Sequence, residues 1–192
     1  MVCAMPSKKR LVRLRRRSYP DYVRPLPPTF KVPPMPTRLF TAPLMDAMPD
    51  RVFAGPVRRY DIQTRGQIPA QWDAYNYAYQ RASSPSPDDY YGLVFNHDAA
   101  TGCFDYMCGQ VLLPDVVLPD GFRTLSVPIG NWARFVTKDH IATMNSAWAE
   151  VMGHWLGQPG CIPRDGPSIE YYSPAFDGAT GRGGYEIWLP VV

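Results

Sequence analysis

A five-residue pattern occurs twice in this chain of 192 residues, as Asp98-Ala-Ala-Thr-Gly102 and as Asp177-Gly-Ala-Thr-Gly181, an offset of 79 positions. The same offset carries Tyr106 onto Tyr185 and Tyr91 onto Glu170. The expected elements around the two copies follow the same order, with a helix and a strand before the loop and another strand after it. Self-similarity of this kind indicates two copies of one supersecondary unit packed together.

The first copy is expected at residues 51–113. It opens with a strand, Val52–Tyr60, and its helix begins near Ile68-Pro69, because proline is tolerated in a first helical turn. The apolar face of this helix follows steps of three and four residues through Ile68, Trp72, Tyr75 and Tyr79. Two further strands, Tyr90–Asn96 and Phe104–Leu113, pair as a hairpin around the first loop.

The second copy is expected at residues 122–192. Asp139 is placed to cap its helix, and Gly157 and Gly160 mark the helix exit. The apolar stripe of this helix is Ile141, Met144, Trp148, Val151 and Trp155. Its strands are Phe122–Val127, Asn131–Thr137, Ile169–Tyr172 and Tyr185–Val191. Two such β-α-β-β units predict an α+β fold with pseudo-twofold symmetry, in which an antiparallel sheet carries two main helices flanking a groove.

Charge and proline content separate the N-terminal segment from the rest. Residues 1–34 contain nine Lys and Arg against one acid, Asp21, so they are net +8 and the remainder is net −5. Prolines 20, 25, 27, 28, 33, 34 and 36 exclude a helix interior or a central strand. We therefore expect residues 1–45 to be a mostly disordered basic arm and residues 46–192 to be the folded domain.

The arm has three readings. The first is that it binds nucleic acid or another anionic surface, and the second is that it is a targeting segment. The third is that it is upstream sequence that natural expression does not use, with Met35, Met45 or Met48 as the working start. A secretory signal is disfavoured because the arm lacks an apolar stretch.

Motifs for catalysis and cofactors are few. Cys3, Cys103, Cys108 and Cys161 form no disulfide framework, which favours a reducing compartment such as the cytoplasm. The three histidines show no zinc-ligand spacing, and there is no nucleophile elbow or phosphate-binding loop. No window approaches eighteen apolar residues. We therefore expect no metal, no cofactor and no membrane span.

Glu170 lies within the apolar and aromatic run Ile169-Glu170-Tyr171-Tyr172. Alternation along a strand places Glu170 on one face with Ser168 and Tyr172. A carboxylate on a half-buried face needs a partner, because an isolated buried charge is very costly. Three interpretations of Glu170 follow: it pairs with an arginine or lysine, it faces a bound cation, or it is a solvated glutamate at the edge of the sheet.

Several motifs, in order and spacing, resemble the GyrI-like, or AraC effector-binding, small-molecule-binding family over residues 51–192. They are Ile68-Pro-Ala-Gln-Trp72, Tyr91-Gly-Leu-Val, Val127-Pro-Ile-Gly-Asn-Trp-Ala-Arg-Phe135, the helix through Trp148 and Trp155, Gly166-Pro-Ser-Ile-Glu-Tyr171 and Tyr185-Glu-Ile-Trp-Leu-Pro190. The resemblance implies a duplicated fold whose aromatic groove binds hydrophobic, often cationic compounds, with the glutamate at the position of Glu170 facing the groove. The regulators of this family carry a helix-turn-helix half, which the N-terminal segment does not resemble.

The resemblance therefore implies a stand-alone protein that binds a small hydrophobic or cationic ligand, with a regulator or gyrase as a further partner and nucleic acid reached only through the arm. The expected ligand-binding residues are Glu170, Trp72, Tyr91, Tyr106, Phe135, Trp148, Tyr172 and Trp188. Core packing is the alternative role for every aromatic residue in this set. An enzyme is the less favoured interpretation: a hydrolase of strained-ring toxins would use Glu170 as general base or acid. The chain has only two other glutamates, Glu150 and Glu186, so a two-carboxylate enzyme would need Glu186 or an aspartate to enter the groove.

Overall fold

The computed structural model describes residues 38–81 and 89–192. The first part contains β1 (Leu44–Met48), β2 (Arg51–Tyr60), a 3₁₀ turn (Arg65–Gln67), α1 (Ile68–Arg81), β3 (Tyr90–Asp98) and β4 (Cys103–Val111). The second contains β5 (Phe122–Val127), β6 (Gly130–Thr137), a 3₁₀ turn (Ile141–Thr143), α2 (Met144–Glu150), a π-helical turn (Val151–Trp155), β7 (Ser168–Tyr172) and β8 (Tyr185–Val191). Every expected strand and both expected helices are present.

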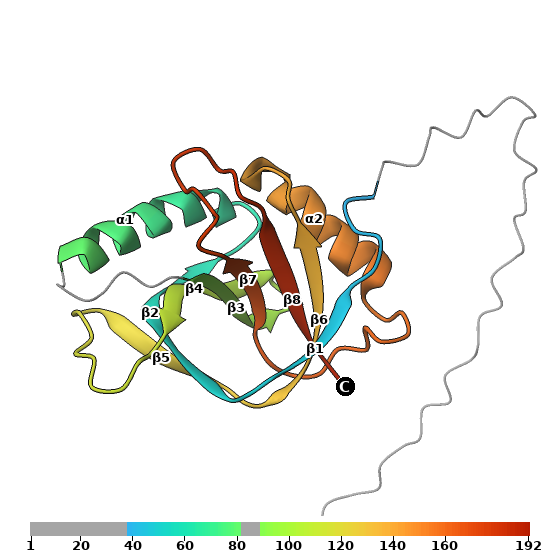
Figure 1. Cartoon of the computed structure of the whole chain (residues 1–192), viewed down its shortest axis with the longest axis horizontal. Helices are drawn as coiled ribbons and strands as arrows, with labels where there is room; N and C mark the ends of the chain where they lie inside the picture. The colour runs from blue at the N-terminus through green and yellow to red at the C-terminus, as the bar shows by residue number, and fades with distance from the viewer. Residues whose placement is uncertain (1–37, 82–88) are drawn as a thin grey trace, which may run out of the picture. The chain divides into compact units, whose positions relative to one another are not determined.

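The strands form one antiparallel sheet in the order β1-β6-β8-β7-β3-β4-β2-β5. Both helices lie on the same side of it, α1 over the first copy and α2 over the second (Figure 1). The sheet and its two helices confirm the expected α+β class, and the face that carries the helices is called here the helix face.

The outermost pair of strands at each end of the sheet forms a ladder, and the two ladders are continuous in register. Leu44–Met48 pairs with β6 and Arg51–Pro56 pairs with β5, and the register is the same in both pairings. The two ladders are separated by Pro49-Asp50 between β1 and β2 and by Pro128-Ile129 between β5 and β6. Proline cannot donate a ladder hydrogen bond, so the pairing is interrupted and the chain bends at this point. The sheet therefore curves strongly, and its second face, the inner face, becomes an apolar core of its own.

The repeat is present, but its alignment shifts by one residue within the copies. β3 and β7 pair at the centre of the sheet with Gly92 directly opposite Glu170 and Tyr91 opposite Tyr171. Gly92 is also opposite Cys108 of β4, and Glu170 is opposite Ile187 of β8, which lies 79 positions after Cys108. The equivalent of Glu170 is therefore Gly92, and the expected equivalence of Tyr91 and Glu170 is wrong. The Asp-to-Gly loop begins six positions after Gly92 and seven after Glu170, so the offset changes from 78 to 79 between strand and loop. β3 runs directly into the loop at Asp98, whereas β7 ends at Tyr172 and an irregular segment leads from it to Asp177.

The second helix begins one residue later than expected. His140, not Asp139, precedes the first turn, and its ring Nδ1 accepts a hydrogen bond from the backbone N–H of Ala142 at 3.1 Å. Asp139 accepts instead from the hydroxyl of Thr137 at 3.0 Å. Gly157 and Gly160 follow the helix with φ of 87° and 81°, in the left-handed region that glycine tolerates, as expected for an exit.

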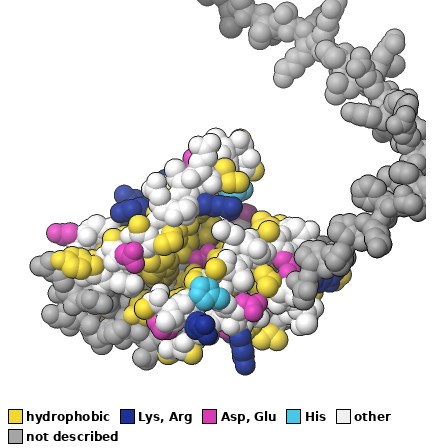
Figure 2. Space-filling view, turned by 90° about the horizontal axis from the view of Figure 1, so that it is seen from above, with side chains coloured by type: hydrophobic (Ala, Val, Ile, Leu, Met, Phe, Trp, Pro, Cys, Tyr) yellow, Lys and Arg dark blue, Asp and Glu magenta, His cyan; other side chains and the backbone are white. Residues whose placement is uncertain are grey.

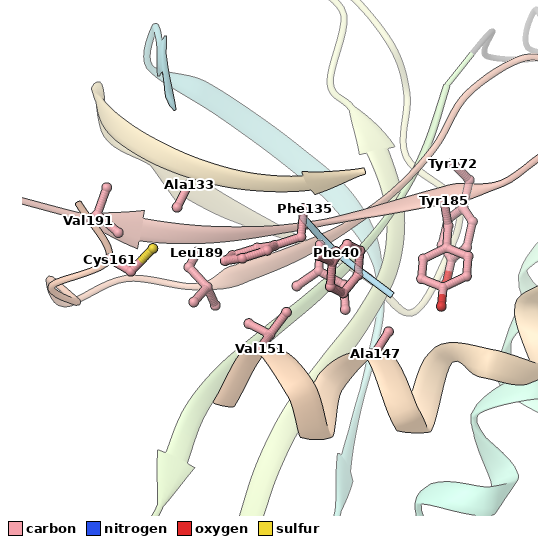
Figure 3. Close-up of a cluster of buried hydrophobic side chains, with 11 residues drawn as sticks. Phe40, Ala133, Phe135, Ala147, Val151, Cys161, Tyr172, Tyr185, Leu189 and Val191 are labelled. Carbon is pink, nitrogen blue, oxygen red and sulfur yellow. The ribbon is translucent and has the colours of Figure 1, made fainter. Parts of the chain in front are cut away.

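The folded part includes residues that the sequence assigned to the arm. Phe40 is 2 % exposed and its ring packs edge-on against Phe135, with 5.4 Å between ring centroids. Figure 3 shows Phe40 among the side chains that α2 and the sheet bury between them, with Ala147 and Val151 pointing toward it from the helix. The backbone N–H groups of Leu39 and Phe40 donate to the Glu150 carboxylate at 2.8 and 3.2 Å. Residues 38–45 therefore pack with the folded unit, and residues 1–37 lie outside the described residues.

Within residues 38–81 and 89–192, no helix is long and apolar enough to cross a membrane.

Candidate functional site

Glu170 lies at the centre of the sheet, on the helix face. Its strand, β7, has β3 on one side and β8 on the other, so Glu170 is flanked by Gly92 and Ile187. Its side chain is buried, with 6 % of the residue surface exposed. This placement excludes the reading of Glu170 as a solvated glutamate at a sheet edge.

Three aromatic side chains donate hydrogen bonds to the Glu170 carboxylate. The hydroxyls of Tyr106 and Tyr172 donate to Oε2 at 2.6 and 3.0 Å, and the indole Nε1 of Trp148 donates to Oε1 at 2.7 Å. The Tyr106 oxygen accepts in turn from Nε1 of Trp72 at 3.1 Å. Five of the eight residues expected at the site therefore form one connected cluster.

The carboxylate has no positive partner in the described part of the chain. The ion pairs there join Arg59 to Asp105 and Arg134 to Asp46 and Glu186. Burial raises the pKa of the Glu170 carboxyl above its ordinary value, and the three hydrogen bonds oppose this shift without cancelling it. The arrangement is a buried acid with neutral donors, which differs from the arginine pair that the sequence left open.

The two hydroxyls stay protonated next to this acid. Burial first, and then the negative charge of Glu170, raise the pKa of Tyr106 and of Tyr172 well above the ordinary tyrosine value. Both groups therefore remain hydrogen-bond donors at physiological pH.

The two helices contribute one indole each to the cluster. Trp72 comes from α1 and Trp148 from α2, and both are partly exposed, so they form the outer layer over Glu170. Ring contacts extend this layer from Trp72 to Tyr172 and Tyr90, at 5.6 and 6.4 Å between centroids, and from Tyr172 to Phe176 at 4.8 Å. Seen from the helix side, hydrophobic side chains gather in a hollow of the surface in which an acidic group is visible (Figure 2).

A buried amide fixes α1 over the sheet. Gln71 is 1 % exposed, accepts from the Tyr60 hydroxyl at 2.8 Å, and donates to the backbone oxygens of Pro56 and Tyr106 at 2.9 and 3.2 Å. The adjacent residue on the helix is Trp72, so this amide determines where the indole lies. α1 is thus held by polar contacts to β2 and β4 as well as by packing.

Phe135 is on the helix face but belongs to the core under α2. It is fully buried, and its ring contacts Phe40 and Trp155, with centroid distances of 5.4 and 5.8 Å. Its environment matches the core-packing alternative for this residue.

Tyr91 and Trp188 lie on the inner face, on the opposite side of the sheet from Glu170. Tyr91 is opposite Tyr171, and Trp188 is opposite Ile169 and Arg134. The sheet separates both residues from the carboxylate, so they do not line the same hollow. The alignment that matched Tyr91 to Glu170 was wrong by one position, and a one-residue shift exchanges the two faces of a strand.

The two other glutamates are engaged elsewhere. Glu186 is on the inner face, where it accepts from Nε of Arg134 at 3.0 Å and from Nε1 of Trp188 at 2.6 Å. Glu150 accepts the backbone N–H groups of Leu39 and Phe40. Neither glutamate is hydrogen-bonded to the Glu170 cluster.

Four residues around Glu170 were not expected from the sequence: Gly92, Gln71, Tyr90 and Phe176. Gly92 and Tyr90 share a strand face, so a correct register for β3 would have indicated both. Gln71 precedes the expected Trp72 in α1, but glutamine is common in helices and nothing in the sequence pattern marks this one as buried. Phe176 follows β7 in an irregular segment, and no periodicity in the sequence points to it.

A protein-family model described as the GyrI-like small molecule binding domain matches residues 46–192. Among solved structures, an integron cassette protein from the mobile metagenome of Vibrio cholerae is 18 % identical, with a TM-score of 0.59 over 80 % of this chain and 97 % of that chain. SAV2435, solved with tetraphenylphosphonium bound, is 16 % identical with a TM-score of 0.59 over 78 % and 93 % of the two chains. The C-terminal domain of EcmrR is 14 % identical with a TM-score of 0.57 over 81 % and 99 %. Identities this low establish the fold alone, and no curated protein sequence matches the chain.

Proposed function

The chain belongs to the GyrI-like family of small-molecule-binding domains, and from this we propose that it binds a lipophilic cation between α1 and α2, with Glu170 as the recognising acid. The ligand-binding residues in this proposal are Glu170, Trp72, Tyr106, Trp148 and Tyr172. Phe135 supports the site from the core beneath α2, and Tyr91 and Trp188 are left out because they lie on the inner face.

The observation that carries the proposal is the environment of the carboxylate. The three donors to Glu170 found among residues 38–81 and 89–192 are neutral, so within this part of the chain they satisfy its hydrogen bonds and leave its charge uncompensated. Burial of a charge without a counter-charge is unfavourable, and this appears as the raised pKa of the Glu170 carboxyl. A cation bound beside Glu170 would supply the missing charge in a medium where Coulomb attraction is much stronger than in water.

The aromatic side chains add a second source of attraction. A cation over an aromatic face gains about 0.5–2 kcal/mol, depending on how far it is desolvated. Trp72 and Trp148 lie on opposite helices and are both partly exposed, so a ligand that enters between the helices meets an indole on each side. A cation with large apolar groups would use both the charge and the walls.

Tetraphenylphosphonium is bound in the structure of SAV2435, which shares the fold. This likeness supports a lipophilic cation as the class of ligand to test, and the local chemistry of Glu170 supports it independently.

Two ions of the same shape test the proposal. Tetraphenylphosphonium and tetraphenylborate have four phenyl groups on one centre and opposite charges, so the walls of a hollow would treat them alike. Titration of the full chain, followed by tryptophan fluorescence and by calorimetry, should give saturable binding of the phosphonium and at least about tenfold weaker binding of the borate. Equal affinities for the two ions would refute recognition by charge, and no binding of either would refute the hollow as a ligand site for this class.

Hydrolysis is not proposed, because Glu150 and Glu186 make their hydrogen bonds away from Glu170 and supply no second carboxylate. A regulator or gyrase partner, and nucleic-acid binding by the arm, stay predictions from the sequence.

A further inference from the structure

Gly92 and Glu170 occupy equivalent positions in the two copies of the repeat. They face each other directly across β3 and β7. Gly92 is opposite Cys108 of β4 in the same way that Glu170 is opposite Ile187 of β8. The centre of the helix face thus has two matched positions, of which one carries a carboxylate and the other carries no side chain.

The space above Gly92 is occupied by the site itself. A Cβ atom added to Gly92 would lie 2.2 Å from the Tyr106 hydroxyl oxygen and 2.8 Å from Oε2 of Glu170. Real Cβ atoms essentially never approach another heavy atom so closely, so any other residue would displace one or both groups. The two displaced atoms are the partners of the 2.6 Å hydrogen bond.

The missing side chain lets the two copies share one acceptor. Glu170 belongs to the second copy, as do Trp148 and Tyr172, whereas Tyr106 belongs to the first and carries the contact from Trp72. The Tyr106 hydroxyl meets Glu170 in the space that a side chain at position 92 would fill. Without that space the carboxylate would lose its donor from the first copy.

We propose that Gly92 is a positioning residue of the binding site, which keeps open the space where the Tyr106 hydroxyl meets the Glu170 carboxylate. The contact between the copies joins side chains of this chain alone, and its consequence for cation binding rests on the function proposed above.

The physical consequence concerns the charge of Glu170. The hydrogen bond from Tyr106 is the largest of the contributions that lower the pKa of this carboxyl against the effect of burial. The other titratable groups that interact with the carboxylate are Tyr172, Cys108 of β4 and Tyr185 of β8. Burial raises the pKa of the thiol and of both hydroxyls, so these groups stay neutral at physiological pH. Loss of the Tyr106 contact should therefore raise the pKa of Glu170 and leave less carboxylate at a given pH.

The first experiment needs no ligand. The indole N–H of Trp148 donates to Glu170, so its NMR resonance should titrate with this carboxyl. We expect Gly92→Ala and Tyr106→Phe to raise the midpoint pH of the Trp148 titration by similar amounts. The double variant should raise this midpoint no further than Tyr106→Phe alone. Gly66→Ala is the matched control, because a Cβ there has nothing within 4 Å, and it should leave the midpoint unchanged.

Two results would overturn the proposal. One is an unchanged Trp148 midpoint in Gly92→Ala, which would mean that the glycine only eases packing. The other is a shift in the double variant equal to the sum of the single shifts, which would mean that Gly92 acts independently of Tyr106. If the single variant Gly92→Ala does not fold, the double variant replaces it, because Tyr106→Phe removes the hydroxyl oxygen that lies closest to the added Cβ. A Trp148 midpoint in the double variant above that of Tyr106→Phe would then show that Gly92 acts independently of Tyr106, and would overturn the proposal.

The second experiment joins the inference to binding. At a pH below the midpoint of the wild-type Trp148 titration, the affinity of full-length Gly92→Ala for tetraphenylphosphonium should be lower than that of the wild type by up to about tenfold, the size expected for one lost hydrogen bond. The affinity of this variant should return to the wild-type value at higher pH, where its carboxyl is ionised as well. A loss that is constant over pH would contradict positioning through Tyr106. If the wild-type protein binds no phosphonium, the proposed ligand fails, while the Trp148 titration still decides the role of Gly92.

Discussion

Replacing Glu170 by glutamine removes the charge of the site while it keeps nearly the same shape. A glutamine can direct its carbonyl oxygen to the Trp148 indole and its amide NH₂ to the tyrosines, whose hydroxyls can rotate to accept. The reverse orientation would set the amide against the indole N–H, donor to donor. The variant should therefore fold, with its amide fixed in one orientation.

The expected magnitude follows from the contacts. Hydrogen bonds to a charged acceptor contribute about 1.5–3 kcal/mol each, and desolvation of a buried carboxylate costs several kcal/mol, so the two changes largely offset. We expect the free energy of unfolding to stay within about 2 kcal/mol of the wild type. The affinity for a cation should weaken by about 1.5–3 kcal/mol, which is roughly ten- to a hundredfold, because an ion pair at about 5 Å with an effective dielectric constant near 20 is worth about 3 kcal/mol.

The assay compares this variant with Glu186→Gln, which makes the same chemical change on the inner face of the sheet. Calorimetric titration with tetraphenylphosphonium gives the affinity, and denaturant unfolding gives the stability. Glu170→Gln should lose affinity for the cation and retain affinity for a neutral aromatic compound such as triphenylphosphine oxide, whereas Glu186→Gln should bind both as the wild type does.

Equal losses for the cation and the neutral compound in Glu170→Gln would refute the reasoning, because they would show that the change damaged the walls and not the charge. An equal loss of cation affinity in Glu186→Gln would also refute it, since that carboxylate is separated from the hollow by the sheet.

Further predictions concern the same cluster and the start of the domain. Trp148→Phe should weaken phosphonium binding several-fold by removing a wall and a donor to Glu170, whereas Trp188→Phe, on the inner face, should lower thermal stability and leave that affinity unchanged. The stability of the wild type relative to Glu170→Gln should be greatest below the ordinary glutamate pKa near 4.5 and should be lost as the pH rises through the raised pKa of Glu170, because the folded state binds this proton more tightly than the unfolded state does. The affinity for the phosphonium should rise over the same pH interval. A relative stability that increases with pH would contradict the conclusion that burial raises the pKa of Glu170. Deleting residues 1–37 should leave the melting temperature unchanged within a few degrees, whereas Phe40→Ala should cost about 3–5 kcal/mol in denaturant unfolding, and equal stability of the two proteins would show that Phe40 is not part of the core.

The sequence predicted the elements and their duplication because both depend on local patterns. The helix through Trp72 and the strand through Glu170 follow from periodicity and from the breakers around them. The loop from Asp98 to Gly102 and its copy mark the repeat without any knowledge of packing. These signals lie within a few residues of one another, so a single sequence contains them.

The start of the domain could not be predicted in this way. Phe40 lies among prolines and basic residues, and its burial depends on Phe135 and on the Glu150 carboxylate, both about a hundred residues away. Composition averages over a segment and therefore assigned Phe40 to the arm. Only the tertiary contact distinguishes a buried aromatic residue from an exposed one there.

By itself, the sequence determined that a glutamate lies in a half-buried strand and that aromatic residues from both copies are available to it. The tertiary structure decided which of them reach it. The register of β3 with β7 places Gly92 beside Glu170, sends Tyr91 to the inner face with Trp188, and leaves room for the Tyr106 hydroxyl. Register is set by pairing between strands far apart in the chain, and a shift of one residue exchanges the faces, so no local pattern could have selected these partners.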